Sequence, residues 1–126
     1  MFTVTIEPRH RMIHVTIVGF WSMDVLPAYV AELRRQTDAL AAVGGCRRIL
    51  VDMTDYPIQS QEVAEAHAQI IGYAKRKLGA PTAVIMPNAL SKLQAKRMAN
   101  LAGRELFDDA ASARAWLLEQ PDAAAA

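Results

Sequence analysis

The chain has only one cysteine, and this scarcity excludes several kinds of site. Cys46 has no second cysteine with which to form an internal disulfide, and no CxxC pair is present to bind zinc or to carry out redox chemistry. Because Cys46 comes just before a predicted strand, we expect a half-buried thiol that is not reactive.

The net charge is also small. The chain has fourteen Lys and Arg side chains and thirteen Asp and Glu side chains, which leaves a formal charge of +1. No overall field draws the protein to nucleic acid or to an anionic membrane, so we expect no nucleic-acid partner. No apolar run approaches the roughly 20 residues of a membrane-spanning helix. We therefore expect no integral membrane segment, while peripheral membrane contact through a local patch stays open.

The start of the chain does not have the pattern of a signal peptide. Residues 1–7 alternate apolar and polar side chains, whereas a signal peptide has a basic start and a continuous apolar run. The predicted location is therefore the cytoplasm. With 126 residues, of which 52% are hydrophobic, the chain has the size and composition of one globular domain. We expect this domain to span residues 1–120, followed by a disordered tail at 121–126.

Hydrophobic periodicity predicts an α/β fold. Alternating runs at 2–6 and 13–17 indicate an antiparallel hairpin, and apolar runs at 48–52, 82–86 and 105–107 indicate three further strands. Apolar residues three and four positions apart predict four helices, which begin near Ser22 or Asp24, near Ser60, near Ala89 and near Asp108 or Asp109. This order predicts a hairpin that continues into a mostly parallel sheet of about five strands, with right-handed crossovers.

Three sequence pieces, taken with this element order, resemble the SpoIIAA-like branch of STAS domains over roughly residues 1–119. They are Gly19-Phe20-Trp21, Ile49-Leu50-Val51-Asp52, and Leu106-Phe107-Asp108-Asp109-Ala110 with Ala115-Trp116-Leu117. The resemblance implies a sheet layered with four helices, in a fold akin to that of CRAL-TRIO lipid carriers. It also implies a regulatory or ligand-carrying module rather than an enzyme.

Ser60 is the one phosphorylation candidate. The best-known members of the wider family are anti-sigma-factor antagonists, switched by phosphorylation of a serine in an Asp-Ser-Ser-Gly-type segment at the start of the second helix. The matching stretch here is Gln59-Ser60-Gln61-Glu62, which keeps one hydroxyl but lacks the Asp and the Gly. The favoured interpretation is therefore a helix N-cap, a role worth about 0.5–2 kcal/mol.

The polar residues of the predicted loops and helices do not form a catalytic motif. Asp52, Thr54 and Asp55 follow the third strand and could act as acids, bases or metal ligands, but one short cluster supplies too few ligands. We favour hydrogen bonds from the two carboxylates to loop N–H groups. His67 lies on the apolar face of the second helix, which favours a packed imidazole with one hydrogen-bond partner. No catalytic residue, metal site or cofactor is predicted.

Aromatic side chains indicate a ligand site at the carboxyl edge of the sheet, where α/β proteins place their sites. Phe20, Trp21 and Tyr56 fall in the loops after the second and third strands, and we expect them to flank one cleft with Trp21 at its rim. The alternative for these side chains is ordinary capping of the core.

Polar residues at the predicted start of the third helix complete this site. Asn88 and Ser91 lie near the helix N-terminus and Lys92 follows, and a helix N-terminus beside a lysine can hold an anion. The alternative is a solvated surface.

These features give two leading hypotheses. The first is a non-enzymatic STAS-like domain, regulatory in role, that binds a small amphipathic or anionic, lipid-like ligand. The second is a protein-interaction module of the anti-sigma-factor-antagonist type without the usual phosphorylated serine motif, in which the same edge binds another chain or forms a homodimer. An enzyme of unrecognised chemistry comes third.

Overall fold

The computed structural model describes residues 1–87, Leu93 and residues 105–120. Its strands are β1 (Phe2–Glu7), β2 (Met12–Ile17), β3 (Arg48–Asp52), β4 (Thr82–Ile85) and β5 (Glu105–Phe107). Its helices are α1 (Leu26–Ala41), α2 (Gln61–Leu78) and α4 (Ala110–Glu119), with short 3₁₀ turns at Pro8–His10 and Met23–Val25. The predicted helix at 89–102 and the predicted tail at 121–126 lie outside the described residues.

The five strands form one sheet whose spatial order, β1-β2-β3-β4-β5, is also the chain order. β1 pairs antiparallel with β2, so that Val4 lies opposite Val15. The pairs β2–β3, β3–β4 and β4–β5 are all parallel. The predicted α/β architecture, a hairpin continued by a parallel sheet, is therefore confirmed.

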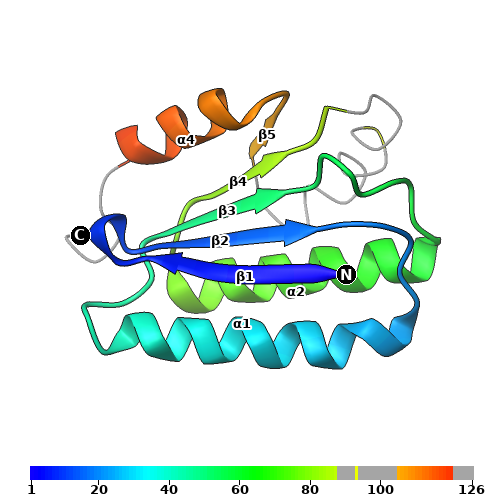
Figure 1. Cartoon of the computed structure of the whole chain (residues 1–126), viewed down its shortest axis with the longest axis horizontal. Helices are drawn as coiled ribbons and strands as arrows, with labels where there is room; N and C mark the ends of the chain where they lie inside the picture. Colours follow the sequence, from blue (N-terminus) through cyan, green and yellow to red (C-terminus); the bar gives the residue numbers. More distant parts are fainter. Residues whose placement is uncertain (88–92, 94–104, 121–126) are drawn as a thin grey trace.

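Helices cover the two faces of the sheet unequally (Figure 1). α1 and α2 lie on one face, where the larger core cluster joins both helices to β1, β2, β3 and β4 through fully buried side chains such as Tyr29 and Val63, and Leu106 of β5 packs against it. α4 lies on the other face, where a smaller cluster joins Ala113 and Leu117 to β2, β3 and β4. Within the described residues, no helix is long and apolar enough to cross a bilayer.

The helix ends confirm some predicted caps and correct one. Ser60 Oγ accepts the Val63 N–H at 3.2 Å, so Ser60 is an N-cap as predicted. Asp109 Oδ1 accepts the Ser112 N–H at 2.7 Å and caps the last helix, whose predicted start was Asp108 or Asp109. The prediction that the Ser22 or Asp24 side chain caps α1 is wrong. A 3₁₀ turn precedes α1 instead, and its backbone carbonyls accept the N–H groups that a side chain would have served.

The α1–β3 loop turns next to the hairpin. The Gly45 N–H donates to the Leu40 carbonyl at 2.8 Å, and both Gly44 and Gly45 have positive φ, which confirms the predicted helix end. A Cβ atom on Gly44 would lie 2.9 Å from the Arg11 guanidinium carbon. Glycine is therefore favoured at position 44 for its backbone conformation, since the flexible Arg11 side chain could move aside for a Cβ atom.

Candidate functional site

The side chain of Gln59 joins, by hydrogen bonds, the two loops in which a site was predicted. Its amide oxygen accepts the Trp21 N–H at 2.8 Å, and its amide nitrogen donates to the Gly19 and Pro57 carbonyls at 3.0 and 2.8 Å. The Gly19 N–H also donates to the Asp55 carbonyl at 3.0 Å. Sequence reasoning missed this role, because the bonds to Trp21 and Gly19 join residues 38 and 40 positions apart. The loops after β2 and β3 are held as one unit.

Trp21 is a core residue, and the prediction that it lies at a cleft rim is wrong. Its side chain is only 2% exposed, and its indole N–H donates to the Val18 carbonyl at 3.0 Å. Tyr56 is also buried, with its ring centroid 5.7 Å from that of Trp21, whereas Phe20 is 72% exposed. The alternative interpretation, capping of the core, is confirmed for Trp21 and Tyr56. Phe20 points to solvent and does not join them.

His67 lies inside the same aromatic cluster. Its ring stacks on Trp21 with centroids 5.8 Å apart, and its Nε2 and Nδ1 atoms lie 3.3 and 3.4 Å from the hydroxyl oxygens of Tyr29 and Tyr56. The predicted packed imidazole is confirmed, although it contacts two hydroxyls rather than one. Burial raises the pKa of both tyrosines, so their hydroxyls keep their protons.

The remaining residues of the predicted site have structural roles or lie outside the described residues. Asp52 Oδ1 accepts the Thr54 N–H at 2.9 Å and the Thr54 hydroxyl at 2.6 Å, as the favoured interpretation predicted. The described ranges contain no group of three or more His, Cys, Asp and Glu side chains placed to hold a metal ion. Asn88, Ser91 and Lys92 are not among the described residues.

A groove of about 480 Å³ lies elsewhere, between α1 and α2. Its half-buried lining is apolar, and the residues concerned are Val30, Leu33, Ala66, Ile70, Ala74 and Leu78. Its exposed lining is polar or aromatic and consists of Arg34, Asp38, Gln69, Tyr73 and Lys77. The groove therefore combines an apolar floor with a rim that carries two cationic side chains, Arg34 and Lys77, and one anionic side chain, Asp38.

The floor of the groove also forms the roof of a small internal cavity. This cavity, of about 40 Å³, lies between the helices and strands β2 and β3 and is lined by apolar side chains except for Tyr29 and Thr37. Leu33, Ile70 and Leu78 line both spaces.

Two features mark the rim of the groove. Tyr73 is 52% exposed, and Lys77 Nζ lies 5.8 Å from the centroid of its ring. The Thr37 hydroxyl is already engaged, because it donates to the Leu33 carbonyl at 2.6 Å. The sequence carried a partial signal for this groove: α2 has a second apolar stripe, at Ala66, Ile70 and Ala74, beside the stripe that packs on the sheet.

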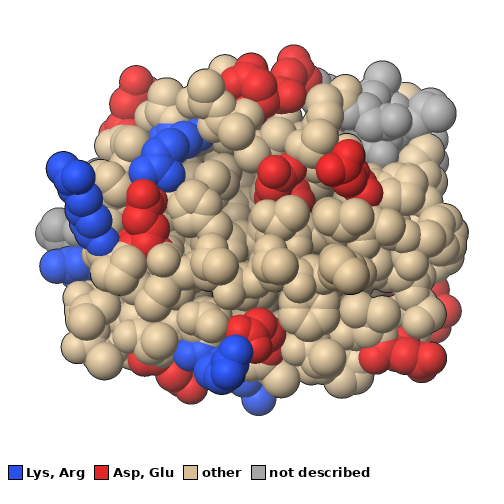
Figure 2. Space-filling view, viewed as in Figure 1, with Lys and Arg blue, Asp and Glu red and all other residues tan. Residues whose placement is uncertain are grey.

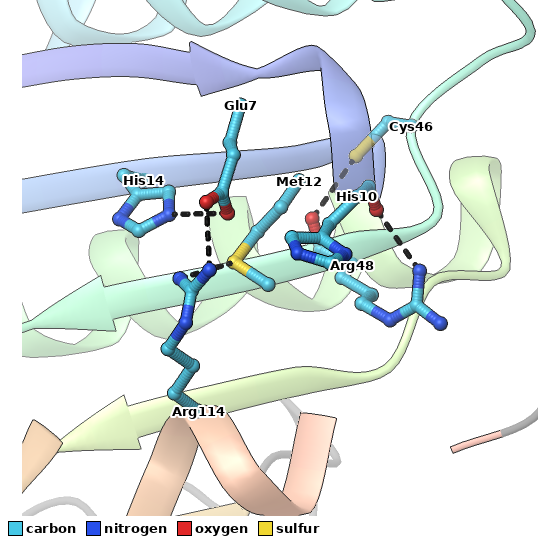
Figure 3. Close-up of polar contacts among 7 residues, drawn as sticks. All are labelled: Glu7, His10, Met12, His14, Cys46, Arg48 and Arg114. Carbon is cyan, nitrogen blue, oxygen red and sulfur yellow. Dashed lines mark hydrogen bonds and ion pairs between the residues drawn. The ribbon is translucent and has the colours of Figure 1, made fainter. Parts of the chain in front are cut away.

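A polar cluster on the opposite face of the sheet attaches α4 to the hairpin (Figure 3). Arg114 donates to Glu7 at 2.6 Å, and His14 Nε2 lies 3.4 Å from the same carboxylate. The hydrogen bond from Arg114 lowers the pKa of Glu7. Arg48 donates to the His10 and Leu117 carbonyls at 2.9 and 3.1 Å. These contacts are structural, since they connect β1, β2, β3 and α4.

Cys46 is buried, whereas the sequence predicted a half-buried thiol. Its Sγ lies 3.5 Å from the Arg48 carbonyl oxygen, and burial raises the pKa of the thiol to about 11. At neutral pH it is therefore an unreactive thiol, which agrees with the prediction about its chemistry.

Comparison with known protein families gives no matching family model, and comparison with curated proteins gives no match either.

Proposed function

We propose that this chain is a non-enzymatic domain that binds a small amphipathic anion, such as a medium-chain fatty acid, in the groove between α1 and α2. The apolar tail would cover Leu33, Ile70 and Leu78, and the carboxylate would lie near Arg34 and Lys77. This proposal keeps the ligand class predicted from the sequence but moves the site from the carboxyl edge of the sheet to the helix layer. The predicted resemblance to SpoIIAA-like STAS domains is part of it, because such a module would carry or sense a ligand.

The observation that carries the proposal is the combination of size and lining. A volume of about 480 Å³ lies within the range of ligand pockets, roughly 300–1,000 Å³, and its floor is made of half-buried apolar side chains. Covering those side chains contributes about 25 cal/mol for each Å² removed from water. Since Arg34 and Lys77 are exposed at the rim, an anionic head group can remain partly hydrated while it pairs with them.

The lining also favours binding over catalysis. The twelve residues that line the groove include no His, Ser or Cys, and the hydroxyl of Thr37 is engaged with the backbone. The lining residues therefore offer no Ser-His or Cys-His pair of the kind that acts in acyl transfer. Binding without turnover is the function that fits them best.

Calorimetric titration with decanoate tests this proposal. We expect the parent chain to bind decanoate and to bind butyrate much more weakly, because the shorter tail leaves most of the floor uncovered. Lys77→Glu should weaken decanoate binding by about fivefold or more, since it reverses a charge next to the carboxylate. Arg76→Glu is the matched control, because Arg76 is exposed on the same helix but does not line the groove.

Three outcomes would count against the groove. They are no detectable binding of decanoate by the parent, an equal loss of affinity in the Lys77→Glu and Arg76→Glu variants, and binding of decanol as tight as that of decanoate. The third would show that the cationic rim does not select an anion.

A second candidate function, protein interaction, rests on a different surface at the carboxyl end of the sheet. Five large apolar side chains are exposed on this surface. They are Met1 and four residues of the two loops joined by Gln59, namely Val18, Phe20, Met23 and Ile58. Residues 18–26 and 52–65 contain Asp24, Asp52, Asp55, Glu62 and Glu65 but no Lys or Arg. A partner that fits this surface is an amphipathic segment with apolar and basic side chains.

A fluorescent helical peptide built from Leu and Lys tests this candidate by anisotropy. We expect it to bind the parent chain, and an equivalent peptide of Leu and Glu not to bind. Phe20→Ser should weaken binding, whereas Val43→Ser should not, because Val43 is a comparably exposed apolar residue in the loop after α1. Equal binding of both peptides, or equal effects of both substitutions, would contradict this candidate.

A further inference from the structure

β1 forms a free edge of the sheet. It pairs with β2 on one side only, and Figure 1 shows it at the front of the sheet with none of the described helices crossing in front of it. α1 packs against β1 from one face and does not take the place of a neighbouring strand. Among the described residues, the backbone groups that point away from β2 therefore have no neighbouring strand to bond.

The hydrogen-bond pattern identifies those groups. The N–H and C=O of Met1 bond to Val18 at 3.1 and 2.9 Å, which makes Met1 and Val18 a hydrogen-bonded antiparallel pair. Such pairs alternate along the ladder, so Thr3, Thr5 and Glu7 also direct their backbone groups toward β2. Phe2, Val4 and Ile6 consequently present their N–H and C=O groups to the outside.

The edge lacks the features by which proteins usually prevent strand pairing. Its sequence, FTVTIE, contains no Pro and no Lys, and its one charged residue, Glu7, lies at the end and is engaged by Arg114. Figure 2, which has the same view as Figure 1, shows the charges gathered above and below an uncharged band that runs over β1. An edge strand of six residues whose one charge lies at its end is suited to pairing with another strand.

We infer that β1 pairs antiparallel with β1 of a second copy of this chain. The register that uses all the outward groups places Val4 opposite Val4 of the partner copy and Phe2 opposite Ile6, with about six backbone hydrogen bonds. A register displaced by two residues would leave part of these groups unpaired. The two sheets would join into one continuous sheet with a two-fold axis at Val4.

The side chains are also self-complementary in this register. Phe2, Val4 and Ile6 share the face that carries α1, and Phe2 and Ile6 are only partly buried in one chain, so the pairing covers apolar surface. On the other face, the exposed Thr3 lies opposite Thr5 of the second copy, and threonine pairs form favourable cross-strand contacts. The partner that fits this edge is therefore the chain itself.

Sedimentation velocity of the full chain between about 1 µM and 1 mM tests the dimer. We expect a reversible species with twice the 13.8 kDa mass of one chain. Thr3→Lys/Thr5→Lys should weaken the dimer at least tenfold, because it places like charges directly opposite one another across the joint. Ala111→Lys/Ala115→Lys is the matched control with the same added charge, on exposed positions of α4 away from the edge, and it should leave the dimer unchanged.

Amide hydrogen exchange of the parent gives a test that needs no variant. The amides of Phe2, Val4 and Ile6 should gain protection as the concentration rises, whereas those of Thr3, Thr5 and Glu7 should be protected at every concentration. A parent that stays monomeric throughout, a dimer that survives Thr3→Lys/Thr5→Lys, or protection that does not depend on concentration would overturn the inference. These outcomes are independent of whether decanoate binds to the groove.

Discussion

The two faces of the sheet come from the same strands but differ in what covers them. On β2, Ile13, Val15 and Ile17 face α1 and α2 and are all buried, whereas His14 and Thr16 face the other side beyond the reach of α4. Met12 lies on the α4 side but is buried in the smaller cluster. The alternation of buried and exposed side chains along a strand therefore depends on two things. One is which face of the sheet is covered by α1 and α2, and the other is where the helix on the second face ends.

The largest expected difference between the faces comes from a charge on adjacent positions of β2. Val15→Lys should cost about 4 kcal/mol of unfolding free energy or more, because it places an unpaired ammonium in the core. Thr16→Lys should change stability by less than about 0.5 kcal/mol, since this position is exposed. Urea denaturation measures the unfolding free energy of both variants. Similar losses in the two would show that the sheet face around Thr16 is covered in solution.

A smaller but still large effect is expected for the helix on the second face. Leu117→Ala should cost about 2–5 kcal/mol, because Leu117 is fully buried between α4 and the sheet. The two tryptophans report on the two faces, since Trp21 lies in the larger cluster and Trp116 packs against the smaller one. With fluorotryptophan labelling, we expect the Trp116 resonance of this variant to lose its native position at lower urea than that of Trp21. Simultaneous loss would mean that the faces unfold as one unit.

The N-caps offer a matched pair with a moderate effect. Ser60→Ala, at the start of α2, and Asp109→Ala, at the start of α4, should each cost about 1 kcal/mol by removing an acceptor for a helix N–H. In the fluorine spectra, we expect the Trp116 resonance to lose its native position before that of Trp21 in the Asp109→Ala variant. We do not expect this order in the Ser60→Ala variant. A cost well above 2 kcal/mol for Ser60→Ala would indicate a role for Ser60 beyond capping.

The smallest expected effect concerns Glu7, which lies on the face of the sheet that carries α4. Its pKa is lowered in the folded chain by the hydrogen bond from Arg114, so its ionised form stabilises the fold above the ordinary carboxyl pKa, and this contribution disappears as pH falls. Glu7→Gln should lower stability at neutral pH by less than about 1 kcal/mol, because the pair is partly exposed. The difference from the parent should shrink as pH falls below the ordinary carboxyl pKa, because the contribution is lost as Glu7 takes up a proton. A difference independent of pH would point to packing instead of charge.

The sequence could predict those parts of the molecule that depend on local pattern. Neighbouring residues predicted the strand at 48–52, the N-cap Ser60 and the packed imidazole of His67. They also predicted the start of the last helix at Asp108 or Asp109. The direction of the Trp21 side chain could not be predicted in this way. It depends on Gln59, which fixes the backbone at Trp21 from another loop.

The groove could not be predicted for a related reason. Its apolar stripe on α2 is visible in the sequence, but the open space exists only because Leu33 and Ile70 on the two helices leave a groove between them. Spacing between helices is a tertiary property that single-helix periodicity does not contain. The predicted anion site at Asn88, Ser91 and Lys92 lies outside the described residues and stays a prediction.

The strand order of the sheet has a consequence for how the chain can fold. Because each strand pairs with the strand that precedes it in the sequence, every new β/α unit adds to an edge that already exists. No strand has to insert between two others, and the ladder contacts stay short in sequence separation for this class of fold. A chain leaving the ribosome can therefore assemble its sheet in order of synthesis, with β1 and β2 as the template for β3. Each partly made sheet then has one growing edge, which the next segment of the same chain covers.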